Sequence, residues 1–390
     1  MSLSKTRLKL DGMKKEMNTQ RLNWVSIIFL SLSSALVLIC VPWYLWQNGF
    51  SWPLLLLTFV FYALTGFSIT MGYHRLFSHR AYEANSFVKV FLLFFGAAAL
   101  QNSCLAWSID HRRHHKDIDT EDDPYNIHKG FLWAHLIWLM FKANSKYSHL
   151  KAKDLENDFL VRFQDKYYLP IAIASGFLLP ALIAHFFFDA FWGGLLFGAF
   201  LRLHIVYHST WFINSFCHMW GRQPYNKMNS ARDNFFIAFF TFGEGYHNFH
   251  HKFPSDYRNA IKWWQFDPSK WFIKGLNFLG FTRNLKKTTA QRIALAALEG
   301  QEKQVVHPHI ENLRERLNEL KIKIDQAQGD FEKYKLQLRT YRKKLNKIST
   351  RQKREFKVEL QRKKNKLDLL QKEFYDSISL YKMSVPVYSV

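Results

Sequence analysis

Three short histidine clusters are the part of this 390-residue sequence best suited to chemistry. Together they hold eight of its 17 histidines. In chain order the clusters are His74 and His79; His111, His114 and His115; and His247, His250 and His251. Imidazole is a borderline nitrogen ligand that suits iron, copper, nickel and zinc. So many imidazoles predict a centre that binds more than one transition-metal ion.

The spacing within each cluster determines which imidazoles can face the same metal ion. Residues at i, i+3 and i+4 share one face of a helix, and the second and third clusters both meet this rule. His74 and His79 are five residues apart, which is about 140° round an α-helix. They can therefore grip one site only if the helix ends or bends there, or if they serve two metal ions.

A ninth candidate ligand is His218, which follows Asn214 by four residues and so shares a helical face with it. His204 and His208 form a similar pair deeper in an apolar block, and on spacing alone they would serve as well. The isolated histidines are expected to be ordinary core or surface residues. These are His128, His135, His149, His185 and His309.

Four apolar blocks are each about long enough to cross a bilayer as a helix, which takes about 20 residues. They cover residues 24–46, 53–71, 168–188 and 191–211. Each pair is joined by a short loop, so the sequence predicts an all-α membrane protein with two transmembrane hairpins. A fifth apolar stretch, residues 87–107, is expected to be interfacial or re-entrant, because a fifth span would separate the first two histidine clusters.

Loop charges predict the orientation of these hairpins. The loops at residues 47–52 and 189–190 carry no Lys or Arg, whereas the N-terminal segment 1–22, the region 75–166 and the C-terminal region are basic. By the positive-inside rule both termini are cytoplasmic and the hairpin tips face outward. All three histidine clusters would then lie in a cytoplasmic helical cap.

The segment from residue 286 to 390 differs in composition from the membrane domain expected at 23–285. Apolar residues recur at alternating three- and four-residue spacing from Ile310 to Ile348, which predicts a coiled-coil seam. We expect a helical hairpin or an oligomeric coiled coil, and a single solvated helix is the alternative. Residues 302–382 contribute +10 to a net charge of +23. In a membrane protein, this charge favours anionic lipids, acidic proteins or anionic substrates over nucleic acid.

The histidine boxes, in this order and beside these hairpins, resemble those of the integral-membrane fatty acyl desaturases, most of all the acyl-CoA (stearoyl-CoA) Δ9 type. The similarity runs from about residue 25 to about residue 275. The strings that carry it begin at Gly72-Tyr-His-Arg-Leu, Asp110-His-Arg-Arg-His-His, Asp122-Asp-Pro-Tyr-Asn, Trp211-Phe-Ile-Asn and Gly243-Glu-Gly-Tyr-His-Asn.

The resemblance implies an oxidoreductase with two iron ions, which uses O2 to place a cis double bond in a saturated acyl chain. Its iron ligands would be the eight clustered histidines and His218, with Asn214 acting through water. It also implies a bent apolar tunnel lined by Trp107, with Gln101 and Asn102 near the acyl carrier. Electrons would come from a separate donor, such as cytochrome b5, ferredoxin or a reductase.

Two departures from the family pattern bear on the acyl carrier. Ile109 stands where animal enzymes carry an arginine for CoA, and the basic pair that follows Trp138-Leu139 is reduced to Lys142. Lys142 is the remaining candidate contact. A CoA thioester, an acyl-carrier-protein thioester and an acyl lipid all stay open as substrates, and the bacterial inner membrane is slightly favoured over the endoplasmic reticulum.

Two other functions compete with this interpretation. A membrane di-iron hydroxylase acting on an alkyl or lipid substrate would share the histidine boxes, although the four-residue gap in the first box favours a desaturase. A transporter or a non-enzymatic metal-binding scaffold would place its histidines near mid-bilayer, whereas these lie beyond the span ends. For the tail we expect self-association, with anionic headgroups as an alternative partner for its basic residues.

Overall fold

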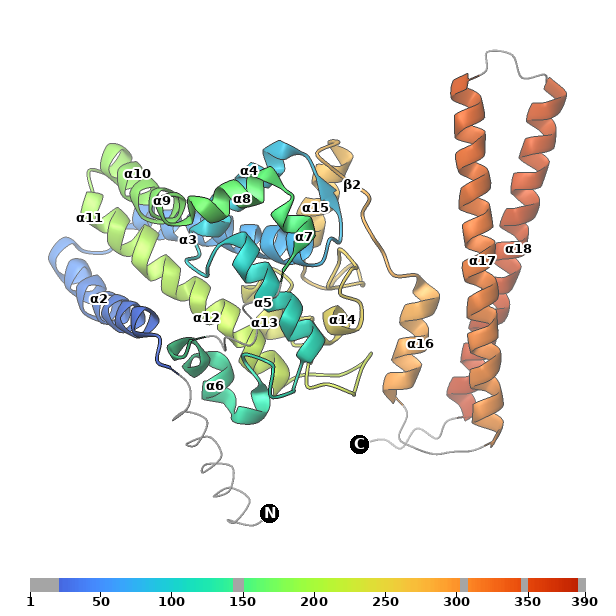
Figure 1. Cartoon of the computed structure of the whole chain (residues 1–390), viewed down its shortest axis with the longest axis horizontal. Helices are drawn as coiled ribbons and strands as arrows, with labels where there is room; N and C mark the ends of the chain where they lie inside the picture. Colours follow the sequence, from blue (N-terminus) through green and yellow to red (C-terminus); the bar gives the residue numbers. More distant parts are fainter. Residues whose placement is uncertain (1–20, 143–150, 302–307, 345–349, 385–390) are drawn as a thin grey trace, which may run out of the picture. The chain divides into compact units, whose positions relative to one another are not determined.

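A computed structural model of the protein describes residues 21–142, 151–301, 308–344 and 350–384. The chain forms two compact units, residues 1–287 and 288–390. Helices predominate in both (Figure 1). His149 lies outside the described residues, as does the side chain of His309.

The first half of unit 1 begins with two long apolar helices. Its elements are α2 (Trp24–Asn48), α3 (Trp52–Phe67), the π-helix η1 (Ser68–Ser78), β1 (Glu83–Ala84), α4 (Ser86–Ala97), α5 (Cys104–Asp117), η2 (Ile127–Lys129), α6 (Phe131–His135), η3 (Ile137–Met140), α7 (Lys153–Glu156) and α8 (Phe159–Lys166). Side chains define several helix starts: Asn23 caps α2, Ser51 caps α3 and Ser103 caps α5 by accepting a backbone N–H.

The second half of unit 1 contains another pair of apolar helices. Its elements are α9 (Tyr168–Ile173), η5 (Ala174–Leu178), α10 (Leu179–Phe188), α11 (Phe191–Gly193), η6 (Gly194–Leu201), α12 (Arg202–Ser215), η7 (Phe216–His218), α13 (Phe235–Phe240), α14 (His247–Lys252), α15 (Pro268–Phe278) and β2 (Thr282–Arg283). Strands β1 and β2 pair antiparallel, with Glu83 opposite Arg283.

Among the described residues, three helices are long and apolar enough to cross a membrane. Unit 1 therefore has the features of a membrane protein. The three helices are Trp24–Asn48, Trp52–Ser78 and Tyr168–Phe188, at three of the four predicted spans. The fourth segment is helical without a break from α11 to α12, but it contains Arg202, His204 and His208. A four-span topology stays a prediction.

The long helices pack through small residues. A Cβ placed on Gly194 would lie 2.4 Å from the Cβ of Ala184, so a larger residue would force η6 away from α10. Around this contact lies a buried cluster formed by Val41, Leu54, Leu57, Phe61, Ala184 and Phe197. The packing gives the membrane portion a fixed frame for the elements that follow each span.

The fifth apolar stretch is broken into two short helices. Helices α4 and α5 are separated by a turn in which Leu100 and Asn102 have φ of 49° and 75°. Left-handed backbone at two non-glycine residues is costly and persists only where the surroundings hold it. Neither helix is long enough to span, in agreement with the sequence-based expectation for this stretch.

Unit 2 is a helical hairpin with a short helix beside it. Helices α17 (Pro308–Lys344) and α18 (Thr350–Ser384) run antiparallel (Figure 1), and α16 (Ala290–Gln301) packs on their base. Leu317, Ile324 and Phe374 are almost completely buried between them. Of the arrangements predicted for the tail, the structure has the hairpin within one chain, and self-association stays a prediction.

Candidate metal centre

Four elements of unit 1 carry the candidate ligands. The π-helix η1 holds His74, with His79 immediately after it; α5 holds the second cluster, η7 ends at His218, and α14 holds the third cluster. A π-helix has i→i+5 hydrogen bonds, and the N–H of His79 donates to the carbonyl of His74 at 3.1 Å. This local winding brings two histidines five residues apart to one site, which an α-helix would not do.

The nine histidines gather into two groups whose ligand nitrogens lie within 4.8 Å of one another. The first group contains His74, His79, His111, His115 and His250. The second contains His114, His218, His247 and His251. Each triplet thus divides between the groups, so the shared helical face does not serve a single metal ion as the spacing suggested.

Distances within each group fit metal coordination. The Nε2 atom of His250 lies 3.0 Å from that of His74 and 2.9 Å from that of His115, and the Nε2 atoms of His247 and His251 are 3.0 Å apart. Two nitrogens bound at about 2.1 Å to one ion, at right angles to each other, are separated by about 3.0 Å. The donor set is neutral nitrogen, which suits a transition metal.

Burial favours the neutral, ligand-competent form of several of these imidazoles. Burial, followed by the neighbouring imidazoles, lowers the pKa of His111, His250 and His251 well below the usual range. Burial also lowers the pKa of His218 to about 3, with His114 adding to the effect. Because metal binding requires deprotonated imidazole, protons will compete weakly at neutral pH.

Buried carboxylates orient one histidine in each group. Oε2 of Glu244 lies 2.8 Å from Nδ1 of His74, and Oδ1 of Asp123 lies 3.0 Å from Nδ1 of His114. Burial would raise the pKa of both acids, but Arg75 beside Glu244 and His114 beside Asp123 bring each pKa below its usual value. Such partners fix the ring orientation, so that Nε2 faces the metal position.

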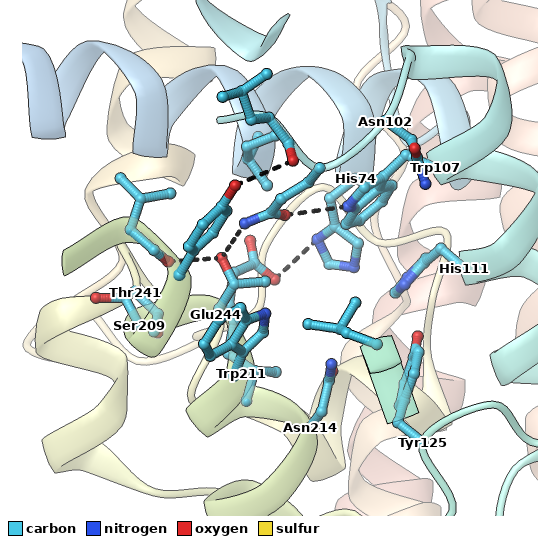
Figure 2. A pocket seen from close by; sticks show the side chains of 18 of the residues that line it. His74, Asn102, Trp107, His111, Tyr125, Ser209, Trp211, Asn214, Thr241 and Glu244 are labelled. Atoms are coloured by element: carbon cyan, nitrogen blue, oxygen red, sulfur yellow. Dashed lines mark hydrogen bonds and ion pairs between the residues drawn. The ribbon is translucent and has the colours of Figure 1, made fainter. Parts of the chain in front are cut away.

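A cavity of about 340 Å³ lies beside the two groups. His74, His111, His114 and His247 line it, and Figure 2 shows His74 and His111 close to Trp107. The Trp107 ring stacks on His111 with centroids 4.8 Å apart. The cavity therefore opens directly onto candidate ligands of both groups.

The cavity wall contains most of the predicted substrate contacts. Gln101, Asn102 and Trp107 line it, and so does Asn214, which is predicted to act on a metal ion through water. Lys142 is exposed and is absent from the lining of this cavity, so its substrate role stays a prediction. Thr210, Glu244 and Asp123 have no role predicted from the sequence. Glu244 and Asp123 nevertheless lie within the sequence strings that resemble the desaturases.

A hydrogen-bond chain fixes the wall around Trp107. Its Nε1 donates to Oε1 of Gln101 at 3.3 Å, and Nε2 of Gln101 donates to Oγ1 of Thr210 at 3.1 Å. Arg202 is fully buried and donates to the carbonyls of Ala98 and Gly176 at 2.7 and 2.6 Å. Helix α12 thereby holds the turn that carries Gln101 and Asn102.

The alternative pair His204 and His208 belongs to neither group. Nε2 of His204 lies 3.1 Å from Oγ of Ser34, and Nδ1 of His208 lies 3.1 Å from Nε2 of His135. The three cysteines are free thiols, with Cys104 and Cys217 buried. Among the described residues, only the nine predicted histidines form groups of three or more side chains that could hold a metal.

Membrane helices, two histidine groups and an adjoining cavity define a membrane protein with a candidate centre for two metal ions. Comparison with known proteins is more specific, because the family model of fatty acid desaturases matches residues 50–275. The chain belongs to the fatty acid desaturase family.

Named relatives agree with this assignment. Acyl-CoA desaturase 1 of Saccharomyces cerevisiae is 38% identical over 313 residues, which are 77% of this chain and 59% of that protein. The probable acyl-CoA desaturase of Schizosaccharomyces pombe is 42% identical over 232 residues, 59% of this chain and 48% of that protein. Stearoyl-CoA desaturase 5 of Bos taurus is 38% identical over 247 residues, which are 62% of this chain and 74% of that protein.

The chain covers less than two thirds of the two yeast proteins. These relatives are all eukaryotic, so the comparisons do not favour the bacterial inner membrane over the endoplasmic reticulum.

Proposed function

We propose that the protein is an acyl-CoA desaturase of the stearoyl-CoA type, which forms a cis double bond, at Δ9, in a saturated long-chain acyl thioester. The observation that carries the proposal is the cavity that opens onto both histidine groups. The names of the relatives support the same activity.

The two histidine groups would each hold one iron ion, with five protein ligands at one ion and four at the other. We assign Asn214, which lines the cavity and precedes His218 by four residues, to a contact with the second ion through water. Bound iron, with O2 and electrons, would supply the oxidant that removes two hydrogens from unactivated methylene carbons.

The protein's own residues would orient the chain and exclude water. Trp107, stacked on His111, places an apolar wall next to the five-histidine group, and the Gln101–Thr210 hydrogen bond holds that wall in position. A fixed wall at this point would determine which methylene carbons lie beside the metals, because the reacting atoms must be positioned within a fraction of an ångström.

Several finer assignments form part of the proposal. A CoA thioester is the carrier named for the relatives, and Gln101 and Asn102 would contact the acyl group near it. A separate electron donor such as cytochrome b5, ferredoxin or a reductase would dock on the basic surface at the ligand side. Both termini would be cytoplasmic. Self-association through the tail remains a further hypothesis. It is tested by whether deleting residues 305–390 lowers the number of chains per particle, measured from the particle mass in detergent.

The first test is product analysis in a host that lacks unsaturated fatty acids. We expect a new cis-Δ9 chain of 16 or 18 carbons when total lipids are analysed by gas chromatography and mass spectrometry. The His250→Ala variant should make none and should bind less iron. Hydroxylated products would reassign the protein to the membrane hydroxylases, and a full yield of olefin from His250→Ala would refute the ligand assignment.

A further inference from the structure

Positive charge in the helical hairpin of unit 2 is concentrated at one end. Residues 333–344, the last part of α17, contain six Lys or Arg and no Asp or Glu, and residues 350–366, the first part of α18, contain eight against two. We call these two segments the hairpin tip. The other ends of the same helices, residues 308–332 and 367–384, contain six basic and nine acidic residues.

The antiparallel pairing brings the two basic segments together. Tyr334 of α17 lies against Phe356 of α18, with ring centroids 5.4 Å apart, whereas Arg316 pairs with Glu373 at 3.1 Å near the base. Helix α17 is about 55 Å long at about 1.5 Å per residue. The hairpin therefore has a strongly basic tip and a slightly acidic base. Repulsion between the two basic segments opposes this arrangement.

Several basic side chains of the tip are directed to solvent. Lys333, Arg354, Lys357, Lys364 and Lys366 are exposed, and none of them forms an ion pair within the described part of the chain. Like-charge repulsion makes such a cluster unfavourable, and contact with an anionic surface would relieve that repulsion. The buried core of the hairpin lies toward the base, at Leu317, Ile324 and Phe374, so the tip does not need its lysines for folding.

We propose that the hairpin tip binds the anionic headgroups of a lipid bilayer. Clusters of four to eight Lys or Arg on a chain attached to a membrane are attracted to negatively charged leaflets. Two apolar side chains among the tip lysines, Leu336 and Val358, are 63% and 49% exposed. They fit shallow contact with a bilayer, whereas the phosphate backbone of a nucleic acid would offer them no apolar partner.

The test uses the full chain in nanodiscs of neutral phosphatidylcholine, mixed with separate vesicles and analysed by co-flotation. Vesicles contain either phosphatidylcholine alone or 30% phosphatidylglycerol. We expect the protein to float with the anionic vesicles only, and to be released by 0.5 M salt because screening is then strong. Equal flotation with both kinds of vesicle would overturn the proposal.

Matched triple variants separate the tip from the overall charge. Lys357→Gln/Lys364→Gln/Lys366→Gln removes three tip charges, and Lys321→Gln/Lys323→Gln/Lys372→Gln removes three near the base. Apparent affinity for anionic vesicles should fall at least about tenfold in the tip variant only. Circular dichroism checks that both variants keep their helices. Equal loss in the two variants, or tip-dependent binding of a nucleic acid but not of vesicles, would refute the lipid assignment.

Discussion

At the scale of single residues, each histidine group depends on one buried acid behind it. Glu244 also accepts hydrogen bonds from Arg75 and Asn259, so its position is set by three partners. Asp123 plays the corresponding part for His114 and also accepts from the backbone of Asp119. The two acids belong to different groups, and their effects can therefore be separated.

We expect Glu244→Gln to weaken metal binding mainly at the five-histidine group, and Asp123→Asn mainly at the four-histidine group. Loss of such an outer partner typically costs about 10–100-fold in metal affinity or activity. Metal content by mass spectrometry, with the spectroscopic signal of each iron, measures the effect. A variant that loses both ions equally would show that the groups are not supported independently.

Arg202 is a positioning residue for the cavity wall. Arg202→Met keeps most of the side-chain volume but removes the donors to the carbonyls of Ala98 and Gly176. Each buried carbonyl that loses its hydrogen bond lowers the free energy of unfolding by about 1–3 kcal/mol. We expect a less stable protein that still binds both metals but makes a broader range of double-bond positions. Arg202→Lys, which keeps the charge, should be intermediate. An unchanged product position in a folded Arg202→Met variant would count against this role.

At the scale of elements, a change from α-helical to π-helical winding positions two metal-ligand candidates, and helical spacing in the sequence did not predict this change. The π-helix η1 follows α3 without a break, and its i→i+5 bond sets His74 and His79 beside each other. The turn between α4 and α5 likewise converts an apolar run into two helices, the second of which carries Trp107 and a histidine cluster. Both features depend on contacts with distant segments, such as Glu244 with His74 and Arg202 with Ala98.

The pairing of α17 with α18 gives a separate prediction at this scale. Ile324 is fully buried between the helices, and Ile324→Asp would place a charge in that core at a cost of about 3 kcal/mol or more. Limited proteolysis should then cut the tail, while acyl desaturation continues, because unit 1 is compact without unit 2. Ile324→Val is the control and should change neither. Parallel loss of activity would mean that the tail supports the catalytic unit.

At the scale of the whole molecule, the loop charges predict that the loops at residues 47–52 and 189–190 face away from the cytoplasm. In a Cys40→Ser background, a membrane-impermeant thiol reagent applied to intact cells should label Asn48→Cys and Ala190→Cys. Lys153→Cys and Asn365→Cys should react only after the membrane is opened. Labelling of Asn365→Cys in intact cells, with Lys153→Cys still protected, would remove the fourth span from the topology, because the residues after that span would then lie outside.

The sequence by itself determined which residues could bind metal and where three membrane helices lie. Eight of the nine histidines are found by residue type and spacing, because few other arrangements place so many imidazoles beside apolar segments. Only the family resemblance favoured His218 over His204 and His208. Long apolar runs indicate membrane-spanning helices directly, because a helix needs about 20 apolar residues to cross a bilayer. The basic and heptad patterns of the tail were equally visible, and so was its separation from the membrane domain.

Only the tertiary structure decided how those residues are shared out. Helical spacing predicts that each triplet faces one point, but His114 and His115 belong to different groups because partners arrive from α14, η1 and η7. Local spacing holds no information about segments more than 100 residues away. For the same reason the pairing of His74 with Glu244, the clamp at Arg202 and the meeting of two basic segments at the hairpin tip emerge only when the chain is folded.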